Sequence, residues 1–223
     1  MPTAKSDTNL STENLVNDVL GTVERERERE IVSKRFGLFD RKETLEQIGE
    51  SLGITRERVR QLEKSVVSRL KQAAEQGKLP YSASFESVVL EKLSKVGRIA
   101  KTATLTEMLV GSTNREEQSR LTFLSELSPN LVVIPEDDHY YPSVADKATF
   151  DEKAIKSNVD KLIGAISKFN EPKKIDVIAK SAGITDSAQA EALASVSKQL
   201  ASLNGQWGLI KWPIVNPKNI RDK

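Results

Sequence analysis

The chain carries the sequence GITRERVRQLE from Gly53 to Glu63. This segment is typical of the turn and the second helix of a helix-turn-helix. Gly53 suits the left-handed residue that follows a helix end, and Thr55 is a good N-cap for the next helix. Thr44 and Gln47 have the spacing of a capping box, so the first helix is predicted to begin at Thr44 and to end just before Gly53.

The second helix has an apolar face and a polar face when its residues are placed about 100° apart. The apolar face is expected to lie in the core and consists of Val59, Leu62, Val66 and Leu70. Helix-turn-helix proteins present the N-terminal part of the opposite face to the major groove of DNA. Here those positions are Arg56, Glu57, Arg60 and Gln61. Because arginine can pair with guanine, glutamate with cytosine N4 and glutamine with adenine, we expect these four residues to contact bases.

Other residues on or beside this helix are expected to contact the DNA backbone, and so to contribute affinity rather than sequence choice. They are Thr55, Arg58, Lys64, Arg69 and Lys71. The alternative interpretation is an ordinary solvated helix face, on which arginine and glutamate form pairs four residues apart. Helix periodicity alone leaves both interpretations open.

Sequence upstream of the turn extends the pattern. The stretches REREIVSKRFGL at residues 27–38 and TLEQIGESLGITRERVRQLE at residues 44–63 are followed by a hydrophobic tail at 66–70. Together they resemble region 4 of the sigma-70 family of RNA polymerase sigma factors, over about residues 15–75. The resemblance implies a four-helix module that binds the promoter −35 element and docks on the flap of the polymerase β subunit.

The same resemblance makes predictions about single residues and about the rest of the protein. Arg56, Glu57, Arg60 and Gln61 match the family's base and backbone contacts. Glu24 stands where the family usually has a core leucine, and Val23 can substitute after a shift of one residue. The family's region 2, which melts the −10 element, is not recognisable in this sequence. We therefore expect a sigma-like protein that does not act as a complete sigma factor.

The fold class expected for the chain is mainly α. A four-helix helix-turn-helix module is followed by two winged-helix-like units with small β-hairpins. In the first of these units, Leu121, Leu124 and Leu127 mark the third helix, and residues 131–134 with Tyr140-Tyr141 are predicted to form the hairpin. The expected boundaries are a disordered tail at 1–14, the module at 15–79, winged-helix-like units at 82–145 and 150–213, and a tail or linker at 214–223.

The last unit contains an internal echo of the first. IAKSAGIT at residues 178–185 parallels IGESLGIT at residues 48–55. The shared small residue, glycine and isoleucine are packing parts of a turn, so they predict shared geometry rather than shared function. The helix after Thr185 has no lysine or arginine before Lys198, which favours a structural or protein-contact role. That helix is predicted to include Leu203, followed by a turn at Asn204-Gly205 and a strand at residues 207–212.

Composition excludes several classes of protein. The 223 residues include no cysteine and one histidine, so disulfides, thiolate zinc sites and histidine-based catalytic sets are not expected. The net charge is +2, but residues 55–78 carry seven lysines or arginines against three glutamates, a local balance of +4. The positive charge is therefore concentrated on the motif helix. Neither a long apolar run nor a signal peptide is recognisable.

These observations predict a sequence-specific DNA-binding transcription regulator that reads a −35-like promoter element and has no enzyme activity, no metal site and no cofactor. Its expected partners are double-stranded DNA and, through the β flap, RNA polymerase, in a bacterial or phage-encoded protein of the cytoplasm. The alternative is an interaction protein that contacts RNA polymerase or a sigma factor without touching DNA. Salt dependence separates the two, since contacts to several phosphates weaken steeply with salt.

Overall fold

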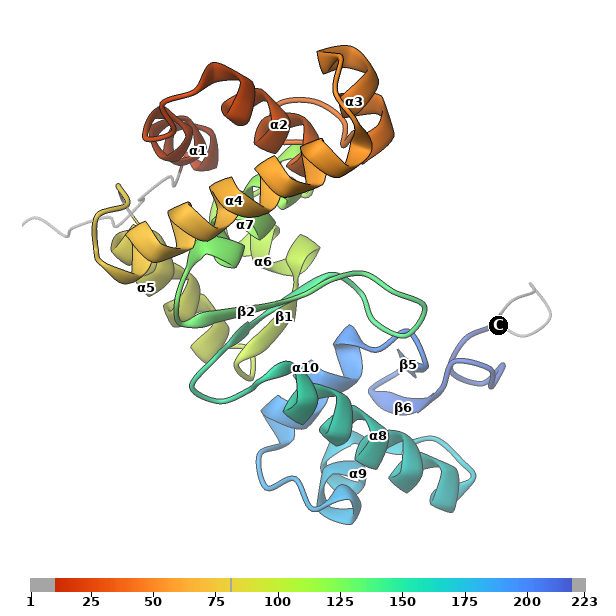
Figure 1. Cartoon of the computed structure of the whole chain (residues 1–223). Helices are drawn as coiled ribbons and strands as arrows, with labels where there is room; N and C mark the ends of the chain where they lie inside the picture. Colours follow the sequence, from red (N-terminus) through yellow and green to blue (C-terminus); the bar gives the residue numbers. More distant parts are fainter. Residues whose placement is uncertain (1–10, 81, 218–223) are drawn as a thin grey trace, which may run out of the picture. The chain divides into compact units, whose positions relative to one another are not determined.

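The computed structural model describes residues 11–80 and 82–217. Over these residues the chain forms ten α-helices and two three-stranded antiparallel sheets (Figure 1), which confirms the predicted mainly α class. Contacts divide the chain into two compact units. Unit 1 extends to residue 86 and includes residues 106–129, whereas unit 2 contains residues 87–105 and the chain from residue 130 onward.

Unit 1 contains the predicted four-helix module and one helix from further along the chain (Figure 1). Its complete helices are α1 (Thr12–Gly21), α2 (Glu26–Phe36), α3 (Leu45–Leu52), α4 (Arg56–Glu75) and α7 (Arg115–Leu127). The division between the units passes through α5 (Ser82–Ser94) and α6 (Thr102–Val110).

Helix α1 begins earlier than the sequence indicated. The Ser11 hydroxyl accepts a hydrogen bond from the Asn14 N–H at 3.3 Å and caps the helix. Residues 12–14, expected in the tail, are therefore helical, while the rest of that predicted tail, residues 1–10, lies outside the described residues. Val23 is buried and Glu24 is exposed, so the core position does shift by one residue.

Helix α7 packs against α1, α2 and α4 and belongs to the same compact unit as the helix-turn-helix. The Phe123 ring meets Phe36 edge-on, with 4.9 Å between ring centroids. Arg120 is buried; its Nε donates to the carbonyl of Leu38 at 2.8 Å and its Nη1 to the Glu117 carboxylate at 2.9 Å. A buried guanidinium is stable only when its charge and donors are matched, so this cluster holds α7 in place.

Unit 2 contains both sheets, with strand orders β1-β3-β2 and β4-β6-β5. The strands are β1 (Ile99–Lys101), β2 (Leu131–Ile134), β3 (Ser143–Asp146), β4 (Lys173–Lys174), β5 (Leu200–Leu203) and β6 (Gln206–Leu209). The helices that lie wholly in this unit are α8 (Glu152–Phe169), α9 (Ile175–Ala182) and α10 (Ser187–Val196). A single apolar cluster includes residues from β1, α8, α9, α10 and the second sheet.

The first hairpin differs from the prediction in its second strand. That strand is Ser143–Asp146, which is buried at every position, and not Tyr140-Tyr141. The Asp137 carboxylate accepts the N–H groups of His139 and Tyr140, each at 2.7 Å, and so closes a loop before the strand begins. The strand β1, for which the sequence carried no recognised signal, completes this sheet.

The end of α10 also differs from the prediction. The helix ends at Val196, and Leu200–Leu203 is a strand instead of its continuation. Asn204 and Gly205 have φ angles of 51° and 74°, which suit a two-residue hairpin turn between β5 and β6. Apolar residues three or four positions apart fit a helix pattern, but the Asn-Gly turn places the last two of them, Leu200 and Leu203, in a β-ladder.

The chain after β6 returns to the core. A Cβ on Gly208 would lie 2.8 Å from the Trp212 ring and 3.1 Å from Val215, so the missing side chain makes room for both. Val215 is consequently buried, although a tail or linker was expected there. Residues 218–223 of that predicted tail lie outside the described part of the chain. None of the described helices is both long and apolar enough to cross a membrane.

Candidate nucleic-acid interface

The turn between α3 and α4 has the predicted construction. The Thr44 hydroxyl and the Gln47 side chain form a complete capping box at the start of α3. Gly53 ends that helix with a φ of 64°, and Thr55 caps α4 by accepting the Arg58 N–H. These local interactions fix where the first turn of α4 begins and hence which side chains it exposes.

A close backbone approach explains the glycine inside α3. The Ile54 N–H donates to the Gly49 carbonyl at 2.9 Å, folding the turn back on the helix. A Cβ on Gly49 would lie 2.7 Å from the Ile54 carbonyl oxygen, closer than side chains pack against backbone. The absence of a side chain at residue 49 leaves room for the Ile54 carbonyl at this turn.

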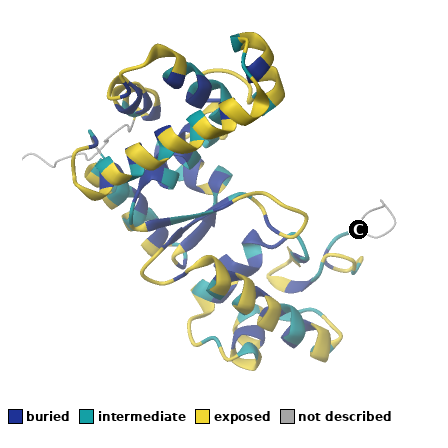
Figure 2. Ribbon diagram, in the orientation of Figure 1, coloured by how far each residue is buried: buried dark blue, intermediate teal, exposed yellow. Residues whose placement is uncertain are grey.

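The helix-turn-helix has its own small core, to which α2, α3 and α4 contribute. Ile31, Ile48 and Val59 are fully buried in it. The Arg27 guanidinium donates to the Leu52 carbonyl at the end of α3. With one face of α4 used for this packing, the other face is free for contact with a ligand; Figure 2 shows the exposed residues along α3 and α4.

All four predicted base-contacting side chains are exposed on the first two turns of α4. Three of them form one hydrogen-bonded set. Arg60 donates from Nε and Nη2 to the two carboxylate oxygens of Glu57, both at 2.8 Å, and Gln61 donates to the same carboxylate at 3.2 Å. The guanidinium of Arg60, and then the amide of Gln61, lower the pKa of Glu57 to about 2. Glu57 is therefore an ionised acceptor at neutral pH.

The fourth predicted base contact, Arg56, has a different partner. Its Nη1 lies 3.0 Å from the carboxylate oxygen of Glu46, which comes from the first turn of α3. Both side chains are exposed. Glu46 was not expected at this site, because its sequence signal is faint: an acidic residue in the first turn of the preceding helix.

The predicted phosphate contacts fall into two groups. Thr55, Arg58 and Lys64 are exposed near the start of α4. By contrast, Arg69 pairs with the buried carboxylate of Glu28, and Lys71 pairs with Glu126 at 2.7 Å. The lysine and arginine of the second group tie α4 to α2 and α7. Glu28 lies 41 residues from Arg69 and Glu126 lies 55 residues from Lys71, so these pairs could not be predicted from the sequence.

The second helix-turn-helix, α9–α10, has a similar turn but a covered second helix. Gly183 has a φ of 73°, and Ile184 donates to the Ala179 carbonyl at 2.9 Å. A Cβ on Gly97, just before β1, would overlap the carbonyl of Ala188 on α10. The backbone before β1 therefore lies directly on the helix that would have to enter a DNA groove.

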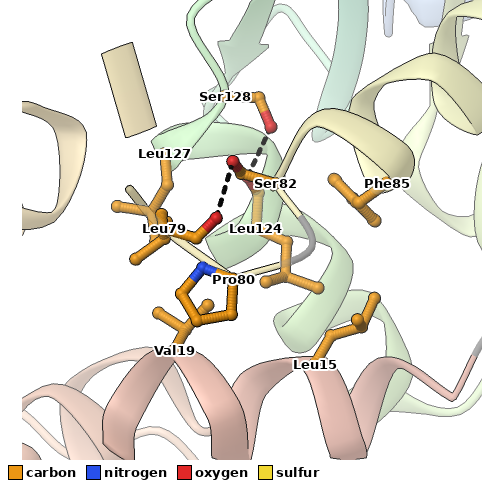
Figure 3. Close-up of a pocket in the computed structure, with 9 residues that line it drawn as sticks. All are labelled: Leu15, Val19, Leu79, Pro80, Ser82, Phe85, Leu124, Leu127 and Ser128. Carbon is orange, nitrogen blue, oxygen red and sulfur yellow. Dashed lines mark hydrogen bonds between the residues drawn. The ribbon is translucent and has the colours of Figure 1, made fainter. Parts of the chain in front are cut away.

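Metal-binding clusters and cavities are the other features of the described residues that could form a site. No cluster of histidine, aspartate or glutamate there has the arrangement of a metal site. An apolar cavity between α1, α7 and the start of α5 has a volume of about 10 Å³ (Figure 3), close to the size of one water molecule. Its polar lining groups are hydroxyls already bonded to carbonyls, Ser82 to Leu79 and Ser128 to Leu124. This cavity is a packing gap and not a ligand site.

The caps and the tight turn make α3–α4 a helix-turn-helix, and its second helix exposes arginine, glutamate and glutamine at its start. Comparison with known families is more specific. Residues 25–72 match the family described as "Sigma-70, region 4". This part of the chain is a sigma-70 region 4 domain, which belongs to transcription factors and not to an enzyme family.

Individual relatives agree with the family match. The "RNA polymerase sigma factor sigB" of Arabidopsis thaliana is 49% identical over 57 residues, which is 25% of this chain and 9% of the relative. The "RNA polymerase sigma factor RpoD" of Helicobacter pylori is 50% identical over 48 residues, 21% of this chain and 7% of the relative. The chain thus covers less than a tenth of either relative. No solved structure gives a significant match.

Proposed function

We propose that this protein regulates transcription by binding a −35-like promoter element through its region 4 domain. The observation that carries the proposal is the row of exposed side chains at the start of α4. Arg56 and Arg60 would donate to guanine, Glu57 would accept from cytosine and Gln61 would pair with adenine. The Glu57–Arg60–Gln61 hydrogen bonds hold three of these groups at one end of the helix before DNA binds.

Contacts to phosphate would come first from the exposed residues Thr55, Arg58 and Lys64. Arg69 and Lys71 belong to the same proposal as weaker contributors, because each already pairs with a carboxylate. A cation shared with a carboxylate releases fewer counterions from DNA than a free one. Removing Lys64 should therefore reduce the salt dependence of binding more than removing Lys71.

The proposal is tested by measuring fluorescence anisotropy of the whole chain on two labelled duplexes, one with a TTGACA-type site and one with the same bases scrambled. We expect a preference for the TTGACA-type duplex and a steep loss of affinity with salt. Arg56→Ala should reduce discrimination at one base pair by about 1–3 kcal/mol. Equal affinity of the unmodified protein for both duplexes would contradict base reading.

A protein partner is the second candidate function. An open groove of about 890 Å³ runs beside α4, from Arg60 past Val67 to Glu75, and α7 contributes Glu126 to it. A polymerase subunit or a sigma factor could bind there without DNA. Binding of purified core RNA polymerase with little salt dependence, together with no DNA binding, would favour this function over the first.

A further inference from the structure

We propose that Glu46 is a specificity-determining residue of the DNA-binding site, acting by holding Arg56 in position. The proposal rests on the proposed function, DNA reading by α4. It concerns a residue of α3 that lies outside the recognition helix, whereas the other three base-reading side chains are joined within α4 itself.

The geometry singles out Arg56 as the side chain that needs an external anchor. Arg56 is the first residue of α4, directly after the Thr55 cap. Glu57 bonds to Arg60 and Gln61, and Gln61 also accepts from Arg58 at 3.4 Å. Arg56 instead pairs with Glu46, across the turn. Without that carboxylate, a long and flexible arginine would sample many rotamers.

The contact leaves Arg56 able to bind a base. The ion pair uses Nη1 of the guanidinium. Arginine recognises guanine through two N–H groups of its planar fork, and the remaining nitrogens of Arg56 can supply them. Glu46 therefore orients the side chain without occupying the whole guanidinium.

The negative charge of Glu46 also favours base recognition by Arg56 over phosphate binding. A carboxylate near DNA repels phosphate, and its ion pair with Arg56 makes phosphate a poorer competitor for the same guanidinium. If Glu46 loses its charge, Arg56 becomes a mobile cation that can bind phosphates of any sequence. Non-specific affinity should rise while specific affinity falls or stays constant.

Glu50 provides a matched control for this effect. It lies one turn further along α3, is exposed, lines the same shallow groove as Glu46 and Arg56, and has no ion-pair partner within the described residues. Glu46→Gln and Glu50→Gln remove the same charge from the same helix. A general charge effect must appear in both variants, whereas loss of the Arg56 anchor can appear only in the first.

The experiment measures the ratio of affinities for the TTGACA-type and scrambled duplexes with the full chain, for the unmodified protein and both variants. We expect Glu46→Gln to lower the ratio roughly 1.5- to 5-fold, the range of exposed ion pairs, and Glu50→Gln to leave it unchanged. In an Arg56→Ala background, Glu46→Gln should have no further effect on the ratio. Circular dichroism melts confirm that each variant is folded.

The possible outcomes are distinct. Equal ratios for Glu46→Gln and Glu50→Gln would overturn the role of Glu46 while leaving DNA reading intact. An effect of Glu46→Gln that persists in the Arg56→Ala background would also overturn it, because Glu46 would then act through another group. If the unmodified protein shows no preference, the proposed function itself fails, and the role of Glu46 falls with it.

Discussion

The two helix-turn-helices of this chain, α3–α4 and α9–α10, have turns with the same hydrogen bond. Ile54 donates to Gly49 and Ile184 donates to Ala179, both at 2.9 Å. Their second helices have opposite surroundings. Helix α4 buries one face in a small core and exposes the other, whereas α10 packs against β1, α8, α9 and β5.

The N-caps of α4 and α10 allow the surface positions of the two helices to be matched. The cap of α10 is Asp186, one residue later than the sequence echo of Thr55 indicates. Counted from the caps, the positions of Arg56, Glu57, Arg60 and Gln61 on α4 correspond on α10 to Ser187, Ala188, Glu191 and Ala192. These are small or acidic residues, and Ala192 is buried. A shared turn therefore predicts shared packing, while the surface of the second helix determines whether it can bind DNA.

Arg120 joins α7 to the segment after α2, and its removal should have the largest effect. Arg120→Ala would leave the Glu117 carboxylate and the Leu38 carbonyl without their buried donor. We expect the free energy of unfolding to fall by about 3–5 kcal/mol, the usual range for breaking a buried ion pair. Urea denaturation measures it. Arg115→Ala, an exposed arginine of the same helix, is the control and should change stability by less than about 0.5 kcal/mol.

The close contact between α10 and the backbone before β1 is tested by Gly97→Ala. The new methyl group would overlap the Ala188 carbonyl, at a φ of 83° that alanine rarely adopts. Strain and overlap each cost about 1–3 kcal/mol, so we expect a combined loss of about 2–6 kcal/mol in the free energy of unfolding. Gly111→Ala, where φ is also positive but nothing lies within 4 Å, separates the strain from the overlap. Equal losses in the two variants would show that α10 is not closely covered there.

Gly49 and Ala179 occupy matched positions in the two turns. Replacing either one by the residue found at the other position should lower the stability of the protein. Gly49→Ala places a methyl group against the Ile54 carbonyl and should destabilise the protein by about 1–3 kcal/mol, despite the better helix propensity of alanine. Ala179→Gly removes a buried methyl group from α9 and should cost about 1–2 kcal/mol. Thermal melts provide both values. A more stable Gly49→Ala protein would show that the first turn can relax.

The smallest effect concerns the charge of Glu57. Its pKa lies at about 2 in the folded chain, below the ordinary 4.5, because Arg60 and Gln61 donate to the carboxylate. The resulting stabilisation is present above pH 4.5 and is lost as the pH falls toward 2. An NMR titration of the side-chain carboxyl carbon should show this pKa, and Arg60→Ala should raise it toward 4.5. A Glu57 pKa already near 4.5 in the unmodified protein would contradict the hydrogen-bonded set.

Sequence patterns predicted the parts of the fold that depend on near neighbours. The Thr44–Gln47 capping box, the left-handed Gly53 and the Thr55 cap are all interactions within a few residues, so their chemistry is visible in the sequence. The exposed positions on α4 followed from helix periodicity. The Asn204–Gly205 turn was also recognised from its own two residues.

Interactions between distant residues could not be predicted in this way. The partner of Arg120 at Leu38 lies 82 residues away, so the sequence could not show that α7 supports the helix-turn-helix. The strand β5 was predicted as helix, because its pairing with β6 and not its leucine spacing determines its conformation. Glu46 was missed for a related reason: its partner is on the next helix, and only the turn geometry brings them together.

The most direct test of the central claim compares the two helix-turn-helices at one matched position. Arg60 on α4 and Glu191 on α10 are both exposed and lie five residues after their caps. Arg60→Ala should lower affinity for the TTGACA-type duplex by about 1–3 kcal/mol, with a smaller loss on the scrambled duplex. Glu191→Ala should change neither affinity. Equal effects of the two substitutions, or a loss of sequence preference in Glu191→Ala alone, would contradict the assignment of DNA reading to α4.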